Sequence, residues 1–392
     1  MMTPRSILTR RVMAALDASS SRIPILLGGC GSGRTTLMQQ LRDRIGRTAT
    51  QYVDVDRTAT TPERFLRAVT QSSPFAPLDS APAGTRAAFD ATLAFFSRAR
   101  AAGNGPATFL LDEFLELRTF ESFPGLRGVL HDLVDGLAGS GNRFVLSSRY
   151  TARALRLLRD RSARFEVIHI PALTAEDTLD MLGLTAGPLA ADHVTHQEAE
   201  FTARAVQALA DGRPTYVQAL TNELTAMRER GGPGGHDVVS VLVALMSPDG
   251  RLARQCCFSY ELRLHRARGY GALKAILDIL AEEEGLTLTE ISQQLLRTPG
   301  STKDYLSWLE DVDLVTSREK RYSYADPMLR LWVRLHCQPT PPTEEDLVRE
   351  VHRYALPRLP QQPEPAMAMA SAGSGSVAVE EERKEWGIIE ID

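Results

Sequence analysis

A short apolar run, a glycine-rich turn and a helix-forming segment follow one another near the amino terminus and constrain the fold more than any other stretch. Residues 23–27 predict a buried strand, and Gly28, Gly31 and Gly33 lie in the turn after it. Glycine permits a backbone in which successive N–H groups point into one concavity, and the helix expected from about Arg34 adds its partial positive end. The stretch therefore predicts a cradle for an anion.

The spacing of this cradle fits the phosphate-binding P-loop pattern G-x-x-x-x-G-[K]-[ST] from Gly28 to Thr35. Thr35 would supply a hydroxyl group to Mg²⁺. The alternative is a glycine-rich connection that binds nothing, but the position between a strand signal and a helix signal favours the P-loop. The residues expected to hold the phosphates are Gly28, Gly29, Cys30, Gly31, Ser32, Gly33, Arg34, Thr35 and Thr36.

Arg34 stands where the P-loop pattern has lysine. Lysine places a compact ammonium group between the β- and γ-phosphates of a nucleotide. The guanidinium group of arginine is larger, planar and bidentate, so it keeps the charge but shifts its position. We therefore expect the chain to bind nucleotide and to hydrolyse it slowly.

A second apolar run, residues 107–111, ends in two acids, Asp112 and Glu113. A strand that is apolar on both faces is typical of a parallel sheet covered by helices, and acids at its carboxyl end lie where α/β folds bind ligands. The pattern predicts that Asp112 holds Mg²⁺ through water and that Glu113 orients the attacking water. The alternative is a strand followed by a polar turn, and the upstream P-loop favours the functional interpretation.

Polar residues also end the apolar strand expected at residues 143–149. In P-loop ATPases with a catalytic acid on the second motif strand, the next strand lies between the two motif strands and presents a polar residue to the γ-phosphate. Ser147 or Ser148 could do this, and Arg149 could reach the phosphate itself. Helix capping by Ser148 and a solvent-exposed charge at Arg149 are the alternatives.

Together with residues 164–177 and the turn at residues 211–216, these motifs resemble the archaeal-type ATPases, a branch of the AAA+/STAND P-loop NTPases. The resemblance covers about residues 20–337. It implies an α/β fold with a P-loop NTPase parallel sheet and a helical lid that places Gly212 and Pro214 over the nucleotide. It also implies ATP and Mg²⁺ as ligands. Independently, Thr174 to Asp177 predict a capping box that opens the lid.

The carboxyl-terminal third predicts an α+β winged-helix domain. A short helix at 288–295, a second helix at 301–309 and a two-stranded wing at 314–324 follow one another. The glycines of residues 231–235 mark the best domain boundary. The predicted divisions are a P-loop core (1–171), a helical lid (172–230), a linker and connecting helix (231–250), a helical and winged-helix domain (251–340), and a flexible linker with an acidic tail (341–392).

The charges of the expected winged helix give mixed signals about DNA. Arg318, Lys320 and Arg321 make the wing tip basic, but Asp304 and Glu310 accompany the second helix. Phosphate neutralisation needs clustered Lys and Arg, so the acids weaken a DNA interface. The expected winged helix could contact DNA, but the sequence favours packing against a protein.

The composition also limits which binding partners and which cellular location are expected. The formal net charge of -4 gives no overall attraction to nucleic acid or to anionic membranes. The four cysteines show no zinc or disulfide spacing, which fits a reducing, cytoplasmic location. No apolar run approaches the ~18 residues that cross a bilayer, so no membrane association is expected.

The sequence as a whole predicts an ATP-binding protein that is a slow, Mg²⁺-dependent ATPase and acts as a nucleotide-controlled switch. Glu113, Arg149 and Ser147 are the expected catalytic residues, and Thr35 and Asp112 the expected metal ligands. A non-hydrolysing nucleotide-binding adaptor and a DNA-binding regulator are the alternatives. A protein partner or self-association is expected in each case.

Overall fold

The computed structural model describes residues 6–18, 21–76, 84–183, 196–229, 237–265 and 269–361. Contacts group residues 1–360 into one compact unit. The predicted boundary at residues 231–235 lies outside the described residues, as do residues 362–392 of the predicted linker and acidic tail. The described part of that segment, residues 341–361, contains a helix at Glu344–Ala355. The elements of the first half are α1 (Ser6–Asp17), β1 (Ile23–Leu27), α2 (Arg34–Ile45), β2 (Thr50–Asp54), α3 (Val55–Thr58), α4 (Pro62–Gln71), α5 (Thr85–Arg98), η1 (Ala102–Asn104), β3 (Thr108–Asp112), η2 (Phe114–Ser122), α6 (Val129–Gly139), β4 (Arg143–Ser148), α7 (Thr151–Leu158) and β5 (Phe165–His169).

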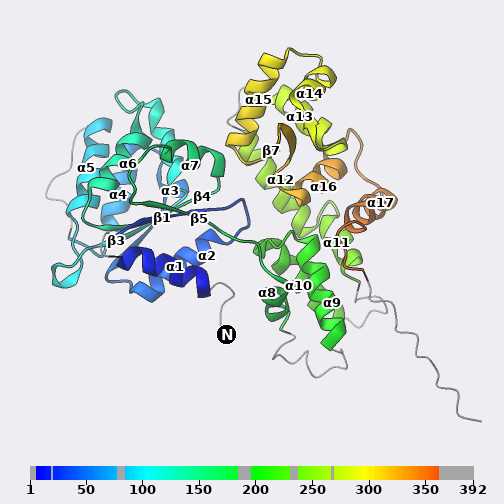
Figure 1. Ribbon diagram of the computed structural model, residues 1–392, viewed down its shortest axis with the longest axis horizontal. Coiled ribbons are helices and arrows are strands. Elements are labelled where there is room, and N and C mark those ends of the chain that lie inside the picture. The colour runs from blue at the N-terminus through cyan, green and yellow to red at the C-terminus, as the bar shows by residue number, and fades with distance from the viewer. Residues whose placement is uncertain are drawn as a thin grey trace, which may run out of the picture. The chain divides into compact units, whose positions relative to one another are not determined.

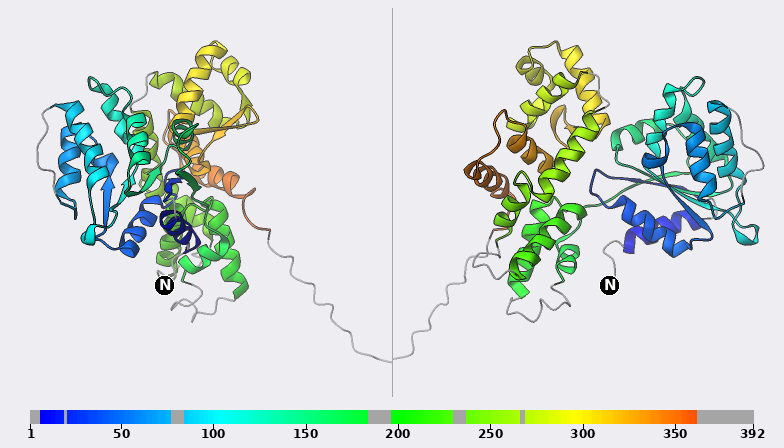
Figure 2. Two further views of the ribbon diagram at one scale, coloured as in Figure 1. Left: turned by 60° about the vertical axis from the view of Figure 1, so that its left-hand side comes forward. Right: turned by 180° about the vertical axis from the view of Figure 1, so that it is seen from behind.

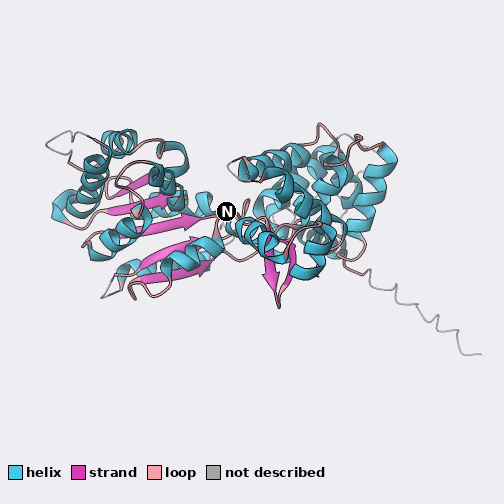
Figure 3. Ribbon diagram, turned by 90° about the horizontal axis from the view of Figure 1, so that it is seen from above, coloured by secondary structure: helices cyan, strands magenta, loops and turns pink. Residues whose placement is uncertain are grey.

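Within the described residues, five parallel strands form one sheet in the order β2-β3-β4-β1-β5 (Figures 1 and 3). The strand after the two acids, β4, lies between β3 and β1, as the sequence predicts. In this register Leu27 pairs with Ser148 and Asp54 pairs with Asp112. The carboxyl ends of β1, β3 and β4 therefore meet at one edge of the sheet, where the predicted site residues lie.

Helices cover both faces of the sheet (Figure 1). On one face, α1 and α2 pack on Leu26, Leu110 and Val145. On the other face, α4, α5, α6 and η2 pack on alternating strand residues such as Phe109 and Phe144, which stack at 5.6 Å between ring centroids. Successive strand side chains point to opposite faces, so both faces must be apolar when both are covered. This explains the continuous apolar runs in the sequence.

The second half is mainly helical. Figure 2 shows its helices from two further sides. Its elements are α8 (Ala175–Met181), α9 (His196–Leu209), α10 (Pro214–Glu229), α11 (Val238–Met246), α12 (Arg251–Leu264), α13 (Tyr270–Glu282), β6 (Leu286–Thr287), α14 (Leu288–Gln294), α15 (Pro299–Asp311), β7 (Val315–Arg318), β8 (Arg321–Tyr324), α16 (Pro327–His336) and α17 (Glu344–Ala355).

One apolar cluster runs through this half, from Leu173 to Ala355. It joins α9 and α10, which belong to the predicted lid, to α11–α17 in a shared core. The predicted capping box is confirmed, because Thr174 accepts a hydrogen bond from the backbone N–H of Asp177 and the Asp177 side chain accepts one in return. The division into lid, linker and winged-helix domain stays a prediction.

The short helices expected near residues 288 and 301 are present as α14 and α15. Within the described residues, β6, β8 and β7 form an antiparallel three-stranded sheet beside them. The predicted two-stranded hairpin is thus extended by β6. Among the described helices, none combines the length and the apolar character needed to cross a bilayer.

Candidate nucleotide-binding site

The glycine-rich turn has the backbone geometry of a cradle. Gly31 has a φ of 76° and Gly33 a φ of 83°, in the left-handed region that favours glycine. A Cβ atom on Gly28 would lie 2.9 Å from the Ser32 hydroxyl, and one on Gly31 would lie 3.1 Å from the Thr215 hydroxyl. These glycines therefore keep the inner wall of the turn free of side chains, and α2 begins directly after it, at Arg34.

The hydroxyl of Thr35 and the carboxylate of Asp112 meet at the edge of the sheet. Thr35 Oγ1 donates to Asp112 Oδ2 at 2.7 Å, and the Tyr52 hydroxyl donates to the same oxygen at 2.8 Å. Ser147 Oγ donates to the other carboxylate oxygen. Hydroxyl and carboxylate oxygens are the ligands that Mg²⁺ prefers, so this pair fits the predicted metal site. Within the described ranges, no group of three or more His, Cys, Asp or Glu is placed to hold a metal.

Glu113 follows Asp112 in a left-handed conformation, with a φ of 57°. This turn aims its carboxylate at two arginines. Arg34 Nη2 donates to Glu113 Oε1 at 2.6 Å, and the backbone N–H of Arg149 donates to Oε2 at 2.9 Å. The backbone N–H of Glu113 itself donates to Ser147 Oγ at 3.2 Å. Because Ser147 also donates to Asp112, its hydroxyl links the two predicted acids.

Arg34 spans the space between the cradle and Glu113. Its Nη1 donates to the carbonyl oxygen of Gly29 at 2.7 Å and to Ser32 Oγ at 3.0 Å. Its side chain is 8% exposed, and that of Glu113 is 11% exposed. The bidentate guanidinium group thus binds the turn with one nitrogen and the acid with the other, which a lysine ammonium group cannot do in the same geometry.

Arg149 is buried and not solvent-exposed, which excludes the alternative of a surface charge. Its Nη2 contacts Asp56 at 2.9 Å, and its Nε lies 3.2 Å from Glu113 Oε2. Burial by itself would lower the pKa of Arg149, but Glu113 raises it well above the ordinary value. Arg149 therefore stays charged beside the predicted catalytic acid. Ser148 does not cap α7, because this helix begins at Thr151 with Tyr150 as its N-cap and has no side-chain cap. Its Oγ instead accepts from the N–H of Tyr150 at 3.0 Å, in the turn before the helix.

The turn at residues 211–216 contacts the cradle through the two neighbours of Pro214, the residue predicted to lie over the nucleotide. The hydroxyl of Thr215 donates to the Gly31 carbonyl at 3.1 Å, and Arg213 Nη1 donates to the Cys30 carbonyl at 3.2 Å. Pro214 itself begins α10. The turn predicted to cover the nucleotide therefore lies against the loop that is predicted to bind it.

Arg213 also reaches residues far along the chain. Its Nη2 donates to the carbonyl of Ala325 at 2.6 Å, and its Nη1 lies 3.1 Å from Asp326 Oδ2. Asp326 accepts from the Tyr216 hydroxyl at 2.8 Å and caps α16 by accepting from the N–H of Met328 at 3.1 Å. Asp326 is 2% exposed. One buried acid therefore connects α10 to α16.

Two residues beyond α11, which sequence reasoning did not identify, also approach the cradle. A Cβ atom on Gly29 would lie 3.1 Å from Asp313 Oδ2. The backbone carbonyl of Asp313 accepts from Arg263 Nη1 at 2.7 Å. Burial raises the pKa of the Asp313 carboxyl group to about 6, although Arg263 and Arg213 oppose this shift. Burial also raises the pKa of the Cys30 thiol, but Arg263 and Arg149 more than reverse this, so the net pKa is lowered.

The structure brings most predicted site residues together. Arg34, Thr35, Asp112, Glu113, Ser147 and Arg149 form one connected set of hydrogen bonds and ion pairs. Thr36, which is exposed near the start of α2, is not part of this set. The sequence alone did not identify four further residues at this site, namely Tyr52, Arg213, Arg263 and Asp313. The only sequence signal was for Arg213, which lies between the two residues singled out in the turn at 211–216.

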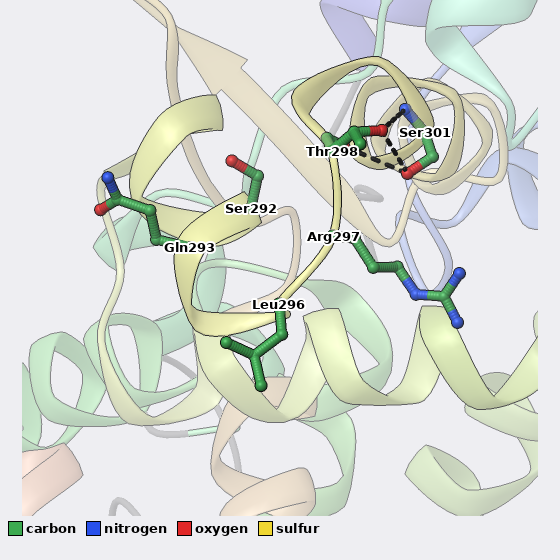
Figure 4. Close-up of a pocket in the computed structure, with 6 residues that line it drawn as sticks. All are labelled: Ser292, Gln293, Leu296, Arg297, Thr298 and Ser301. Atoms are coloured by element: carbon green, nitrogen blue, oxygen red, sulfur yellow. Dashed lines mark hydrogen bonds between the residues drawn. The ribbon is translucent and has the colours of Figure 1, made fainter.

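A separate hollow of about 650 Å³ lies between α14 and α15, outside this set (Figure 4). Thr298 caps α15 by accepting from the N–H of Ser301 at 3.4 Å, and the two hydroxyls lie 3.2 Å apart. Leu296, with a φ of 54°, is 91% exposed beside it. The hollow is an open surface depression and contains none of the predicted catalytic or phosphate-binding residues.

Comparison with known proteins identifies the fold. No protein-family model and no curated protein matches the sequence. The Walker-type ATPase of Pyrococcus abyssi matches 84% of this chain and 95% of its own, with a TM-score of 0.59 and 16% identity. The ORC1 protein of Aeropyrum pernix, solved in complex with DNA, matches 90% and 93%, with a TM-score of 0.45 and 17% identity. RuvB of Thermotoga maritima, a Holliday junction branch migration motor, matches 82% and 91%, with a TM-score of 0.42 and 13% identity.

These identities are low, so the likeness concerns the fold alone. The parallel sheet, with its covering helices and its glycine-rich turn after β1, matches a P-loop NTPase fold.

Proposed function

We propose that this chain binds ATP with Mg²⁺ and hydrolyses it slowly, as a nucleotide-controlled switch. The observation that carries the proposal is the connected set at the sheet edge, in which the Thr35–Asp112 contact lies beside Glu113 and its two arginines. A hydroxyl, a metal-binding carboxylate and a second carboxylate at the end of a glycine cradle are the groups that phosphoryl transfer to water requires.

In the proposed mechanism the amide groups of residues 28–35 bind the phosphate oxygens. Thr35 and Asp112 would hold Mg²⁺, which when bound neutralises charge that develops on the phosphates. Glu113 accepts a hydrogen bond from the attacking water and so orients it in line with the bond that breaks. Arg149 stabilises charge on the γ-phosphate oxygens. No covalent intermediate is needed, because positioning and charge stabilisation supply the catalysis.

Slow turnover follows from the ion pair between Arg34 and Glu113. While Arg34 binds Glu113 Oε1, one acceptor site of that oxygen is occupied and its orientation is fixed toward the guanidinium group, so fewer sites are left for the attacking water. Both side chains are largely buried, so the pair is desolvated and costly to separate. Phosphate oxygens can compete for the guanidinium group, and this exchange makes the acid fully available to water. A long-lived ATP state is what a switch requires.

The test compares ATP binding and phosphate release for the wild type, Glu113→Gln and the exposed control Glu283→Gln. We expect all three to bind ATP with Mg²⁺, and Glu113→Gln to lose turnover by about 100-fold. Equal background rates of phosphate release in the wild type and Glu113→Gln would reject the proposal of ATP hydrolysis. The chain would then be a non-hydrolysing nucleotide-binding adaptor. Particle size measured with ATP and with ADP tests self-association in the same samples.

A DNA-binding regulator is a second candidate, supported by the exposed turn between β7 and β8. Arg318, Lys320 and Arg321 are all exposed there. We propose that α13–α15 with β6–β8 form a winged helix whose wing carries these cations. Anisotropy titrations with duplex DNA at low and moderate salt test this, with the three residues changed together to Ala. If the affinity for DNA does not change with salt concentration, or does not change when the three residues are replaced, the DNA-binding proposal is rejected.

A further inference from the structure

A second cavity, of about 290 Å³, lies beside Arg149 and contains none of residues 28–36. We call it the arginine pocket. The side chains that line it come from α3, from η2, from α7 and the two residues before it, from α12, and from α15 and the residue after it. Its charged lining residues among the described residues are Asp56, Glu116, Arg118, Arg149, Arg153 and Arg263.

Four arginines and two acids line the pocket, so the lining itself has an excess of positive charge, although Glu113, outside the lining, also pairs with Arg149. Asp56 is already paired with Arg149 at 2.9 Å. Arg153 lies 3.5 Å from Asp311, which is outside the lining set. Burial and the neighbouring Arg118 lower the pKa of Arg153 to about 10. Cations held this close in a partly buried space are stabilised by an anion between them.

One of the four guanidinium groups carries an unused donor. The Nε atom of Arg263 is buried and has no hydrogen-bond partner, and the residue is 4% exposed. The Nε atom of Arg149, which is 9% exposed, forms an ion-pair contact with Glu113 Oε2 at 3.2 Å that lacks hydrogen-bond geometry. Arg263 uses Nη1 on the Asp313 carbonyl, and Arg149 uses Nη2 on Asp56. Buried donors without a partner are rare in folded proteins, and at a binding site they indicate a missing acceptor.

We propose that the arginine pocket binds a phosphate group that is distinct from the phosphates in the cradle. Guanidinium forks match the oxygens of a tetrahedral oxyanion, and four arginines line this pocket. The volume of about 290 Å³ suits a single phosphate group with its waters or a small phosphomonoester. The ligand is either the phosphate released by hydrolysis or the phosphate of a separate small metabolite.

The pocket shares Arg149 with the candidate site, and this part of the proposal rests on the proposed function. Arg149 contacts Glu113 on one side and lines the pocket on the other. A bound phosphate competes with Glu113 for its Nε donor. We therefore expect phosphate in the pocket to lower kcat for ATP without raising KM, whereas phosphate in the cradle would raise KM.

The binding test uses the full chain and inorganic phosphate. Gly31→Val places a branched side chain in the cradle at a φ of +76°, which should block phosphate there. The residue that its Cβ atom would meet, Thr215, is not among the residues that line the arginine pocket. In that background we expect calorimetry to detect phosphate binding, and Arg118→Gln with Arg153→Gln to weaken it by about tenfold or more. The exposed Arg204→Gln on α9 is the matched control, with a change below about twofold.

Melting temperatures check that each variant folds, and Arg118→Gln alone is the second variant because Arg118 is exposed. A folded Gly31→Val chain that binds no phosphate, or an affinity that survives removal of both arginines, overturns the proposal. Tighter binding of methyl phosphate than of inorganic phosphate assigns the site to a metabolite, and the reverse assigns it to the released product. If the wild type binds no ATP but phosphate binding depends on Arg118 and Arg153, the nucleotide function fails and the pocket stands.

Discussion

Arg34 and Glu113, 79 residues apart in the sequence, form a buried ion pair with 2.6 Å between Nη2 and Oε1. The pair joins the start of α2 to the end of β3. It connects the residue that departs from the P-loop pattern to the predicted catalytic acid. The replacement of the P-loop lysine by Arg34 therefore acts directly on the predicted catalytic acid.

Replacing Arg34 with Lys should raise ATP turnover. The lysine ammonium group is compact and cannot bind the Gly29 carbonyl and Glu113 with two separate nitrogens, so Glu113 becomes available to water. We expect kcat to rise by about tenfold, which corresponds to about 1.4 kcal/mol in the barrier. Phosphate release at saturating ATP and Mg²⁺ measures this, with exposed Arg44→Lys on the same helix as the control. An unchanged or lower kcat would contradict the proposed role of the ion pair.

Ser147→Ala should destabilise the fold. The buried Ser147 hydroxyl accepts from the N–H of Glu113 and donates to Asp112, so its removal leaves a buried donor without a partner. The expected loss in the free energy of unfolding is about 1–3 kcal/mol. Urea unfolding measures it, and the exposed Ser97→Ala on α5 should stay within about 0.5 kcal/mol of the wild type. A similar value for both variants would show that the link between the two acids contributes nothing to stability.

Gly31→Ala should weaken ATP binding while the chain stays folded. The new Cβ atom would lie 3.1 Å from the Thr215 hydroxyl, and the φ of +76° strains any residue except glycine. We expect ATP affinity to fall by about tenfold or more. Gly125→Ala is the matched control, because Gly125 has a φ of +80° but nothing within 4 Å of the added atom. Equal ATP affinity in both variants would separate the cradle from nucleotide binding.

Asp313→Asn should change how stability depends on pH. The folded-state pKa of Asp313, about 6, lies above the ordinary value of about 3.9 for an unfolded Asp. The folded state therefore binds this proton more tightly, and the wild type loses stability as pH rises from about 4 to about 6. Above about pH 6 the loss in the free energy of unfolding is complete and stays constant.

Asparagine has no such proton and accepts the φ of 59° at this position. The free energy of unfolding of the variant, minus that of the wild type, should rise between about pH 4 and 6 and then level off. Urea titrations of both chains at several pH values measure this difference. A constant difference across the range would show that Asp313 is not buried against the cradle.

Much of the sheet could be predicted because its signals are local. The apolar runs ending at Leu27 and Asp112 became β1 and β3, since strands covered on both faces need continuous apolar residues. The capping box at Thr174 needs only four consecutive residues, and it is confirmed. The position of β4 between β3 and β1 followed from the resemblance to P-loop ATPases and is confirmed as well.

The contacts from the second half of the chain could not be predicted in this way. Arg263 and Asp313 reach the cradle from α12 and from the end of α15, more than 200 residues after it in the printed sequence. Neither residue belongs to a motif in the sequence. Such contacts depend on how helices pack in three dimensions, which periodicity along the chain does not encode.

The shared contacts of Asp326 have a mechanical consequence. Arg213 touches the Cys30 carbonyl and Asp326 together, and Asp326 in turn anchors Tyr216 and the first turn of α16. The carbonyl of residue 30 is therefore connected to both α10 and α16 through the side chains of Arg213 and Asp326. The phosphate loop and two helices far along the chain thus share one buried polar joint.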